Sequence, residues 1–161
     1  DWHNNACLNY MPDHGTAYTE GYRRAADILI KHIDESGRDQ DFLVYPVLFL
    51  YRHHIELLIK QIVGLALVLS EEPDTDQYKK DNHNLNTLWL LANKLLPEVN
   101  DSHRSSNFRL IKEVVKKLHN AHRLVTDLRY ARRNDDTRSF EGIQDVNTSC
   151  FREKWKRLPI Y

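Results

Sequence analysis

Cysteine, glycine and proline are all scarce in this chain of 161 residues, which has 2 Cys, 5 Gly and 5 Pro. Cys7 and Cys150 lie near opposite ends and form no C-x-x-C pair, which excludes a disulfide scaffold and a cysteine-built zinc site, although one disulfide between them stays open. With 41% hydrophobic residues, the chain is also not collagen-like, disordered or of low complexity. We expect one soluble, cytoplasmic domain over residues 1–161.

Net charge is absent as well, because 23 Lys and Arg balance 23 Asp and Glu. The charges are unevenly distributed, however. Residues 1–103 carry 9 basic against 16 acidic residues, and residues 104–161 carry 14 against 7. A basic C-terminal third favours binding of anions such as nucleic acid, while neutralisation of one segment by the other within the fold is the alternative.

A long uncharged apolar run is missing too. The most apolar stretch, residues 42–69, is interrupted by Arg52, Glu56 and Lys60, whereas a membrane span needs about 20 nearly uncharged residues. We therefore expect a buried helix and no association with a membrane.

Apolar residues recur at helical spacing, and no segment alternates with the period of two that is typical of strands. We predict an irregular lead-in over 1–15, a helical core over 16–128, a charged loop over 129–147 and a short helix over 148–158. The core helices are expected at about 16–36, 41–69, 83–97 and 106–125, with Pro46 either in a first turn or at a kink. The fold class is all-α, an antiparallel bundle of four to five helices.

The common catalytic motifs are absent. The chain has no Gly-rich phosphate loop, no G-x-S-x-G turn, no H-E-x-x-H zinc helix and no pair of E-x-x-H motifs. His119 and His122 share a predicted helix face without a carboxylate at helical spacing, and His122 lies on the apolar stripe. We expect packed histidines there, and neither a metal nor a cofactor.

The most unusual feature is a polar cluster within the most apolar helix. Buried charges must be paired or must face a cleft, because burying an unpaired charge costs several kcal/mol. Glu56 lies four residues from both Arg52 and Lys60, so one interpretation is a charged stripe that neutralises itself. The other is an acid–base site in which Arg52, His53, His54 and Glu56 are catalytic.

A second cluster follows the predicted core. Arg129, Tyr130, Arg132 and Arg133 combine guanidinium groups with an aromatic ring, which suits phosphate binding together with base stacking. With Lys60 they are our candidate nucleic-acid-binding residues. A solvated basic loop is the alternative.

Three sequence elements carry a resemblance to a known family. Residues 45–60 (YPVLFLYRHHIELLIK) resemble the YP-x-x-x-x-YRH-x-x-EL-x-LK signature of bacterial HEPN-like (higher eukaryotes and prokaryotes nucleotide-binding) proteins. Residues 83–89 (HNLNTLW) resemble the H-[DN]-L-x-x-L-W element of that group, and residues 128–131 (LRYA) its F-R-Y-[PA] element. The three elements occur in the family's order and span roughly residues 16–138.

The resemblance implies a helical bundle that often dimerises, in a superfamily linked to RNA binding, RNA cleavage, toxin–antitoxin systems and phage defence. It implies RNA or a nucleotide as ligand, a homodimer, and a protein partner such as an antitoxin. Its ribonucleases carry an Arg followed after four to six residues by a His, for metal-independent attack by the ribose 2′-hydroxyl, and no Arg here has that spacing. Two functions stay open: a metal-independent endoribonuclease, or a non-catalytic RNA-, nucleotide- or protein-binding dimerisation module.

Overall fold

The computed structural model describes residues 2–8, 14–69, 83–95, 128–142 and 145–147. These ranges contain a short 3-10 helix, η1 (Trp2–Asn4), and the helices α1 (His14–Ser36), α2 (Gln40–Leu69) and α4 (Leu85–Leu95). Within them the only β-type pairing is an isolated bridge between Arg132 and Arg138. The described part of the chain is therefore all-α, as predicted.

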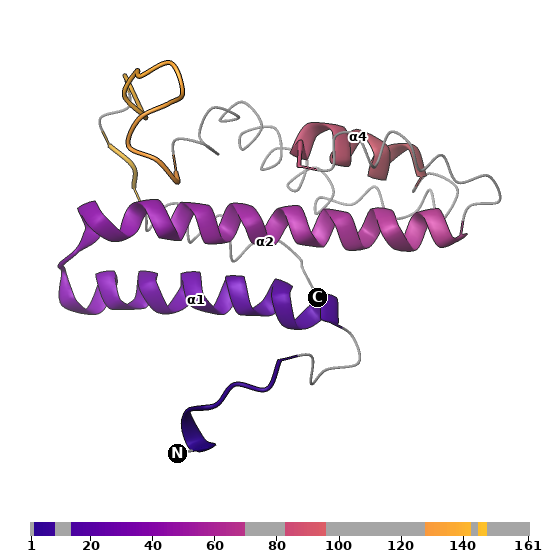
Figure 1. Cartoon of the computed structure of the whole chain (residues 1–161), viewed down its shortest axis with the longest axis horizontal. Coiled ribbons are helices and arrows are strands. Elements are labelled where there is room, and N and C mark those ends of the chain that lie inside the picture. The colour runs from indigo at the N-terminus through magenta and orange to yellow at the C-terminus, as the bar shows by residue number, and fades with distance from the viewer. Residues whose placement is uncertain (1, 9–13, 70–82, 96–127, 143–144, 148–161) are drawn as a thin grey trace.

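Helices α1 and α2 form an antiparallel pair joined by a very short turn (Figure 1). Gly37 adopts a φ of 63°, a left-handed conformation that glycine reaches without a steric penalty, and its N–H donates to Ile33 O at 2.9 Å. Asp39, whose φ is also 63°, accepts the N–H groups of Phe42 and Leu43 on its carbonyl oxygen as α2 begins. The turn therefore ends one helix and starts the next within three residues.

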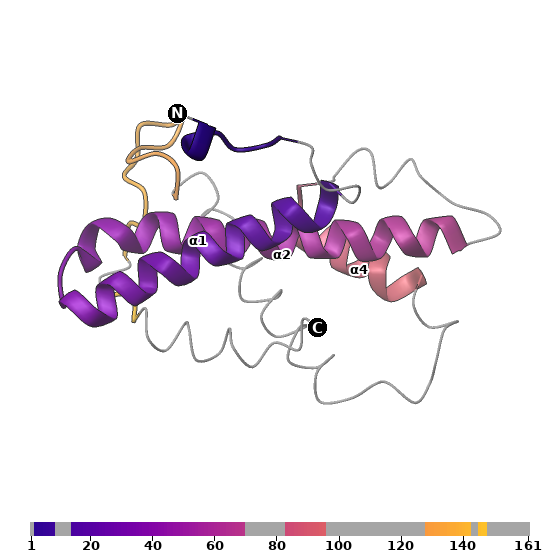
Figure 2. The ribbon, with the colours of Figure 1, turned by 90° about the horizontal axis from the view of Figure 1, so that it is seen from below.

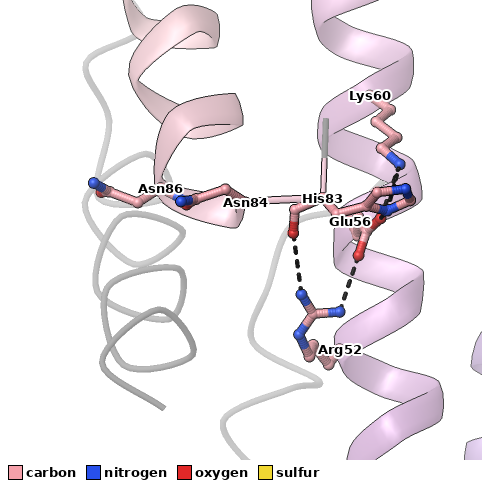
Figure 3. Close-up of polar contacts among 6 residues, drawn as sticks. All are labelled: Arg52, Glu56, Lys60, His83, Asn84 and Asn86. Carbon is pink, nitrogen blue, oxygen red and sulfur yellow. Dashed lines mark hydrogen bonds and ion pairs between the residues drawn. The ribbon is translucent and has the colours of Figure 1, made fainter. Parts of the chain in front are cut away.

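Helix α4 lies on another side of α2 and begins beside its middle (Figures 1 and 3). Helix α4 runs parallel to α2, toward the C-terminal end of α2. The predicted antiparallel arrangement is therefore right for α1 and α2 but wrong for α2 and α4. Parallel neighbours need a long connection, and residues 70–84 supply the length. The buried apolar side chains of the three helices belong to one core: Ala26, Ile30, Ile33, Val47, Tyr51, Ile55, Ile59, Val63, Leu67, Leu85, Leu88, Trp89, Leu91 and Ala92.

The helix boundaries follow the predictions closely. Helix α1 includes residues 14 and 15, which shortens the predicted lead-in, and the described helix α4 (Leu85–Leu95) lies within the predicted range 83–97. Pro46 lies inside α2 beyond its first turn, where its missing N–H removes one helical hydrogen bond. The helices predicted over 106–125 and 148–158, with His119 and His122, lie outside the described residues.

By length and composition alone, residues Gln40–Val68 of α2 meet the criteria for crossing a membrane, which the core helices of soluble proteins also meet. In this fold α1 and α4 pack against α2, and its middle carries the buried ionic groups of Arg52 and Glu56. Exposed apolar side chains occur nearer its two ends, for example Phe42 and Leu65. The cytoplasmic location and the absence of a membrane segment stay predictions.

Candidate functional site

Four ionisable side chains meet where α4 begins against α2 (Figure 3). The carboxylate of Glu56 lies at their centre. Its Oε2 accepts a hydrogen bond from Arg52 Nη1 at 2.9 Å, and its Oε1 lies 2.8 Å from both Lys60 Nζ and His83 Nδ1. Arg52, Glu56 and Lys60 follow one another at intervals of four residues, so successive turns of α2 place them in one row. We call these four residues the ionic cluster.

The ionic cluster also fixes the start of α4. Arg52 Nη2 donates to the carbonyl oxygen of His83 at 3.3 Å. The next residue, Asn84, is the N-cap of α4, since its Oδ1 accepts the N–H groups of Asn86 and Thr87 at 3.0 and 3.2 Å. His83 is therefore held through both its backbone and its imidazole.

Burial differs sharply within the ionic cluster. Glu56 is 2% and Arg52 5% exposed, whereas the His83 side chain is 81% exposed. Burial alone would raise the pKa of Glu56, but the hydrogen bonds from Lys60 and His83 and the charges of Lys60 and Arg52 together lower this pKa below its ordinary value. Glu56 is therefore ionised at neutral pH, and with Arg52 and Lys60 charged the cluster carries a net positive charge.

The state of the His83 imidazole follows from its neighbour. An ionised carboxylate only accepts hydrogen bonds, so His83 Nδ1 carries a hydrogen atom and donates a hydrogen bond to Glu56. With Nδ1 engaged, Nε2 is the nitrogen that an exposed ring presents to solvent or to a substrate. A buried carboxylate that orients an exposed imidazole is the arrangement by which enzymes position a histidine base.

The four residues predicted to be catalytic do not form one group. Arg52 and Glu56 are paired in the ionic cluster, but the two histidines between them make other contacts. The rings of His53 and Tyr22 lie nearly perpendicular with centroids 4.4 Å apart, and His53 stacks on Phe49 at 5.8 Å. His54 is fully buried under α1, where its Nδ1 donates to the carbonyl oxygen of Thr19 at 2.9 Å. Burial lowers the pKa of both imidazoles.

His83 was missed as a site residue because it lies 27 residues beyond Glu56 in the sequence. The sequence pointed to His83 only through the resemblance, in which it is the first residue of the H-N-L element. In the structure, the charged residues of the first two resembling elements, 45–60 and 83–89, meet in the ionic cluster.

Residues 128–142, which hold the predicted basic cluster, fold back on themselves, and we call this segment the turn. Ser139 N–H donates to Ala131 O at 3.1 Å beside the bridge between Arg132 and Arg138. Arg132 Nη1 pairs with Asp136 Oδ1 at 3.3 Å inside this turn. Arg133 Nη1 likewise donates to Thr137 Oγ1 at 3.3 Å.

Of the predicted basic cluster, Arg129, Tyr130 and Arg132 are exposed, and Arg129 and Tyr130 pack against each other. The Arg129 guanidinium lies 5.4 Å from the centre of the Tyr130 ring, which is 57% exposed. The turn rests on the N-terminal end of α2, through Phe140 against Tyr45 at 5.5 Å between centroids (Figures 1 and 2). Lys60 lies fifteen residues farther along α2, ~22 Å by helical rise, so the structure does not bring it to this basic cluster.

In the described ranges, no three His, Cys, Asp or Glu side chains lie close enough together to hold a metal ion. The polar chemistry of the described site is that of the ionic cluster, an imidazole with a carboxylate and two cations. Comparisons of the chain with models of known protein families, with curated proteins and with solved structures found no match.

Proposed function

We propose that the chain is an HEPN-like, RNA-associated domain and that it cleaves RNA without a metal ion, with His83 as the proton acceptor. One observation carries this proposal: the exposed imidazole of His83 is held by Nδ1, 2.8 Å from a buried carboxylate of Glu56. An imidazole held through one nitrogen by a carboxylate presents its other nitrogen as a proton acceptor, which suits removal of a proton from an alcohol.

The proposed reaction uses the ribose of the RNA itself as nucleophile. His83 Nε2 takes the proton of a 2′-hydroxyl, and the 2′-oxygen attacks the adjacent phosphorus. The bond from phosphorus to the 5′-oxygen breaks, and that oxygen takes a proton from water. The protonated imidazole returns its proton to the hydroxide that remains, which restores both the water and the base. The products are a 2′,3′-cyclic phosphate and a 5′-hydroxyl, and no metal, oxidant or further reactant is consumed.

Each other member of the ionic cluster has a supporting role in this proposal. Glu56 orients the imidazole and stabilises its protonated form after proton transfer. Arg52 and Lys60 keep Glu56 ionised and add positive charge beside the site, which favours approach of a polyanion. These are positioning roles, because Arg52 is buried and does not reach a substrate.

The test is an RNA cleavage assay on a mixed RNA pool with EDTA present. We expect the unchanged chain to cleave and His83→Gln to lose the activity by about 100-fold or more, the scale of a general base. His32→Gln is a matched control, because His32 is also an exposed histidine paired with a carboxylate, that of Asp39 at 2.9 Å. If His83→Gln and His32→Gln cleave equally, or if the unchanged chain does not cleave, the proposal is wrong.

A non-catalytic RNA-binding module is the second candidate. The exposed Arg129 and Tyr130 favour it, since this pair offers a cation and a ring to a nucleic acid at a distance from His83. RNA binding without cleavage, weakened by Arg129→Ala and by salt but not by His83→Gln, would establish it. A homodimer and a protein partner such as an antitoxin stay expectations of the resemblance, and sedimentation of the purified chain tests the first.

A further inference from the structure

Aromatic rings follow one face of α2 up to the ionic cluster. Tyr45, Phe49 and His53 are spaced four residues apart, and Lys60 follows His53 by seven residues, so successive turns place all four on the same side of the helix. Phe49 and His53 stack with an interplanar angle of 5° and centroids 5.8 Å apart. We call Tyr45, Phe49 and His53 the aromatic row.

The aromatic row is flanked by further rings. The ring of Tyr22 in α1 lies nearly perpendicular to that of His53, and Phe140 of the 128–142 turn contacts Tyr45. Tyr45 is 46% exposed, and Phe49 and His53 are half-buried, so all three ring systems are open in part to solvent. Core packing does not account for a line of partly open rings, because the core side chains of α2 lie elsewhere on the helix: Val47, Tyr51, Ile55, Ile59, Val63 and Leu67.

Both ends of the aromatic row carry basic side chains. One end leads to the ionic cluster, where Arg52 and Lys60 outweigh Glu56. The turn at the other end presents the exposed Arg129 against Tyr130. Rings between cations are the combination that binds single-stranded nucleic acid, since bases stack on the rings and phosphates lie near the charges.

We infer that the aromatic row is a base-stacking surface for single-stranded RNA, which leads the strand along α2 to His83. This rests on the proposed function and adds its substrate class. From Tyr45 to Lys60 the surface extends ~22 Å, the length of about six stacked nucleotides at 3.4 Å each. A duplex is a poor ligand for the same surface, because paired bases do not expose their faces.

The test measures binding separately from cleavage by using the His83→Gln chain. Fluorescence anisotropy compares three labelled ligands at the same salt concentration: an oligouridylate of about eight nucleotides, an abasic strand with the same number of phosphates, and a duplex. We expect the oligouridylate to bind about tenfold or more tightly than the abasic strand and the duplex. Equal affinity for the oligouridylate and the abasic strand would overturn the inference.

Two variants locate the effect. In the same background, Phe49→Leu and Tyr45→Leu keep apolar bulk but remove a ring, and each is expected to weaken oligouridylate binding about fivefold or more while abasic binding stays constant. Leu65→Ala is the control, because Leu65 is 67% exposed on a different face of α2. Tyr45 is the more exposed of the two, so its replacement tests the row even if Phe49→Leu unfolds the chain.

Failure of this inference differs from failure of the proposed function. If the unchanged chain cleaves RNA but both ring variants bind oligouridylate as well as Leu65→Ala does, the ribonuclease proposal stands and the aromatic row is not its base site. If binding depends on bases and on the two rings while no cleavage occurs, the row is supported and the ribonuclease proposal is wrong.

Discussion

Replacing Glu56 with glutamine tests whether its carboxylate compensates the buried positive charge of Arg52. Glutamine has nearly the same size and keeps one acceptor oxygen, but it carries no charge. The side chain of Arg52 is only 6% exposed, so Glu56→Gln leaves its positive charge buried beside a neutral amide. The perturbation is therefore electrostatic, with little change in packing.

The expected loss follows from the burial of each partner. Removing one member of a buried ion pair costs about 3–5 kcal/mol, mainly because the other charge stays buried without compensation. Lys60 and His83 add little, since their side chains are 19% and 81% exposed and can be hydrated. We expect Glu56→Gln to lower the free energy of unfolding by about 3 kcal/mol, a large share of the 5–15 kcal/mol typical of a domain.

The assay is urea unfolding followed by circular dichroism at neutral pH. Glu20→Gln is the matched control, because Glu20 also pairs with two arginines, Arg23 at 2.7 Å and Arg24 at 3.5 Å, but on the more exposed surface of α1. Exposed pairs contribute about 0–1 kcal/mol, so the control should change little. Equal losses for Glu56→Gln and Glu20→Gln would refute the reasoning, because they would mean that Arg52 reaches solvent or another counter-charge.

Two further predictions concern stability. Burial lowers the pKa of His54, so the unfolded chain binds a proton at this residue more tightly than the folded chain does. The free energy of unfolding therefore keeps its full value above the ordinary pKa of 6.5 and decreases as the pH falls below it. His54→Asn should therefore flatten the dependence of the free energy of unfolding on pH between about 7.5 and 5.5, and an unchanged slope would assign the dependence to other groups. At the start of α4, Asn84→Ala should lower the free energy of unfolding by about 1 kcal/mol, as measured by thermal or urea unfolding. Asn84→Asp should not lower it, because aspartate keeps the cap and adds a negative charge where the helix dipole favours one. Equal stability of the two Asn84 variants would show that the cap contributes nothing.

Much of the fold was predictable from local patterns. The stripe from Ala26 to Ile33, the turn residue Gly37 and the apolar run after Phe42 located α1 and α2 to within two residues. These features act between residues three or four apart, so the sequence displays them directly. The pairing of Arg52 with Glu56 and of Glu56 with Lys60 belongs to the same class, and the structure confirms both.

The direction of α4 was not predictable in this way. A preference for antiparallel neighbours holds for short connections such as residues 37–39, whereas residues 70–84 are long enough for either direction. In the observed direction the start of α4 lies beside the middle of α2, where Arg52 donates to the carbonyl oxygen of His83, a contact between residues 31 positions apart that no local pattern encodes.

By itself, the amino-acid sequence determined the helices, their apolar faces and the one helical row in which Glu56 is paired, because helical periodicity and i,i+4 spacing are properties of neighbouring residues. Only the tertiary structure decided which groups share a site. It packed His53 against Tyr22 of α1 and placed His54 under α1, and it brought the exposed His83 to the buried Glu56 across 27 residues. The physical reason is that adjacent residues on a helix point about 100° apart, so His53 and His54 diverge from Arg52, while a distant residue reaches the carboxylate once α4 packs against α2.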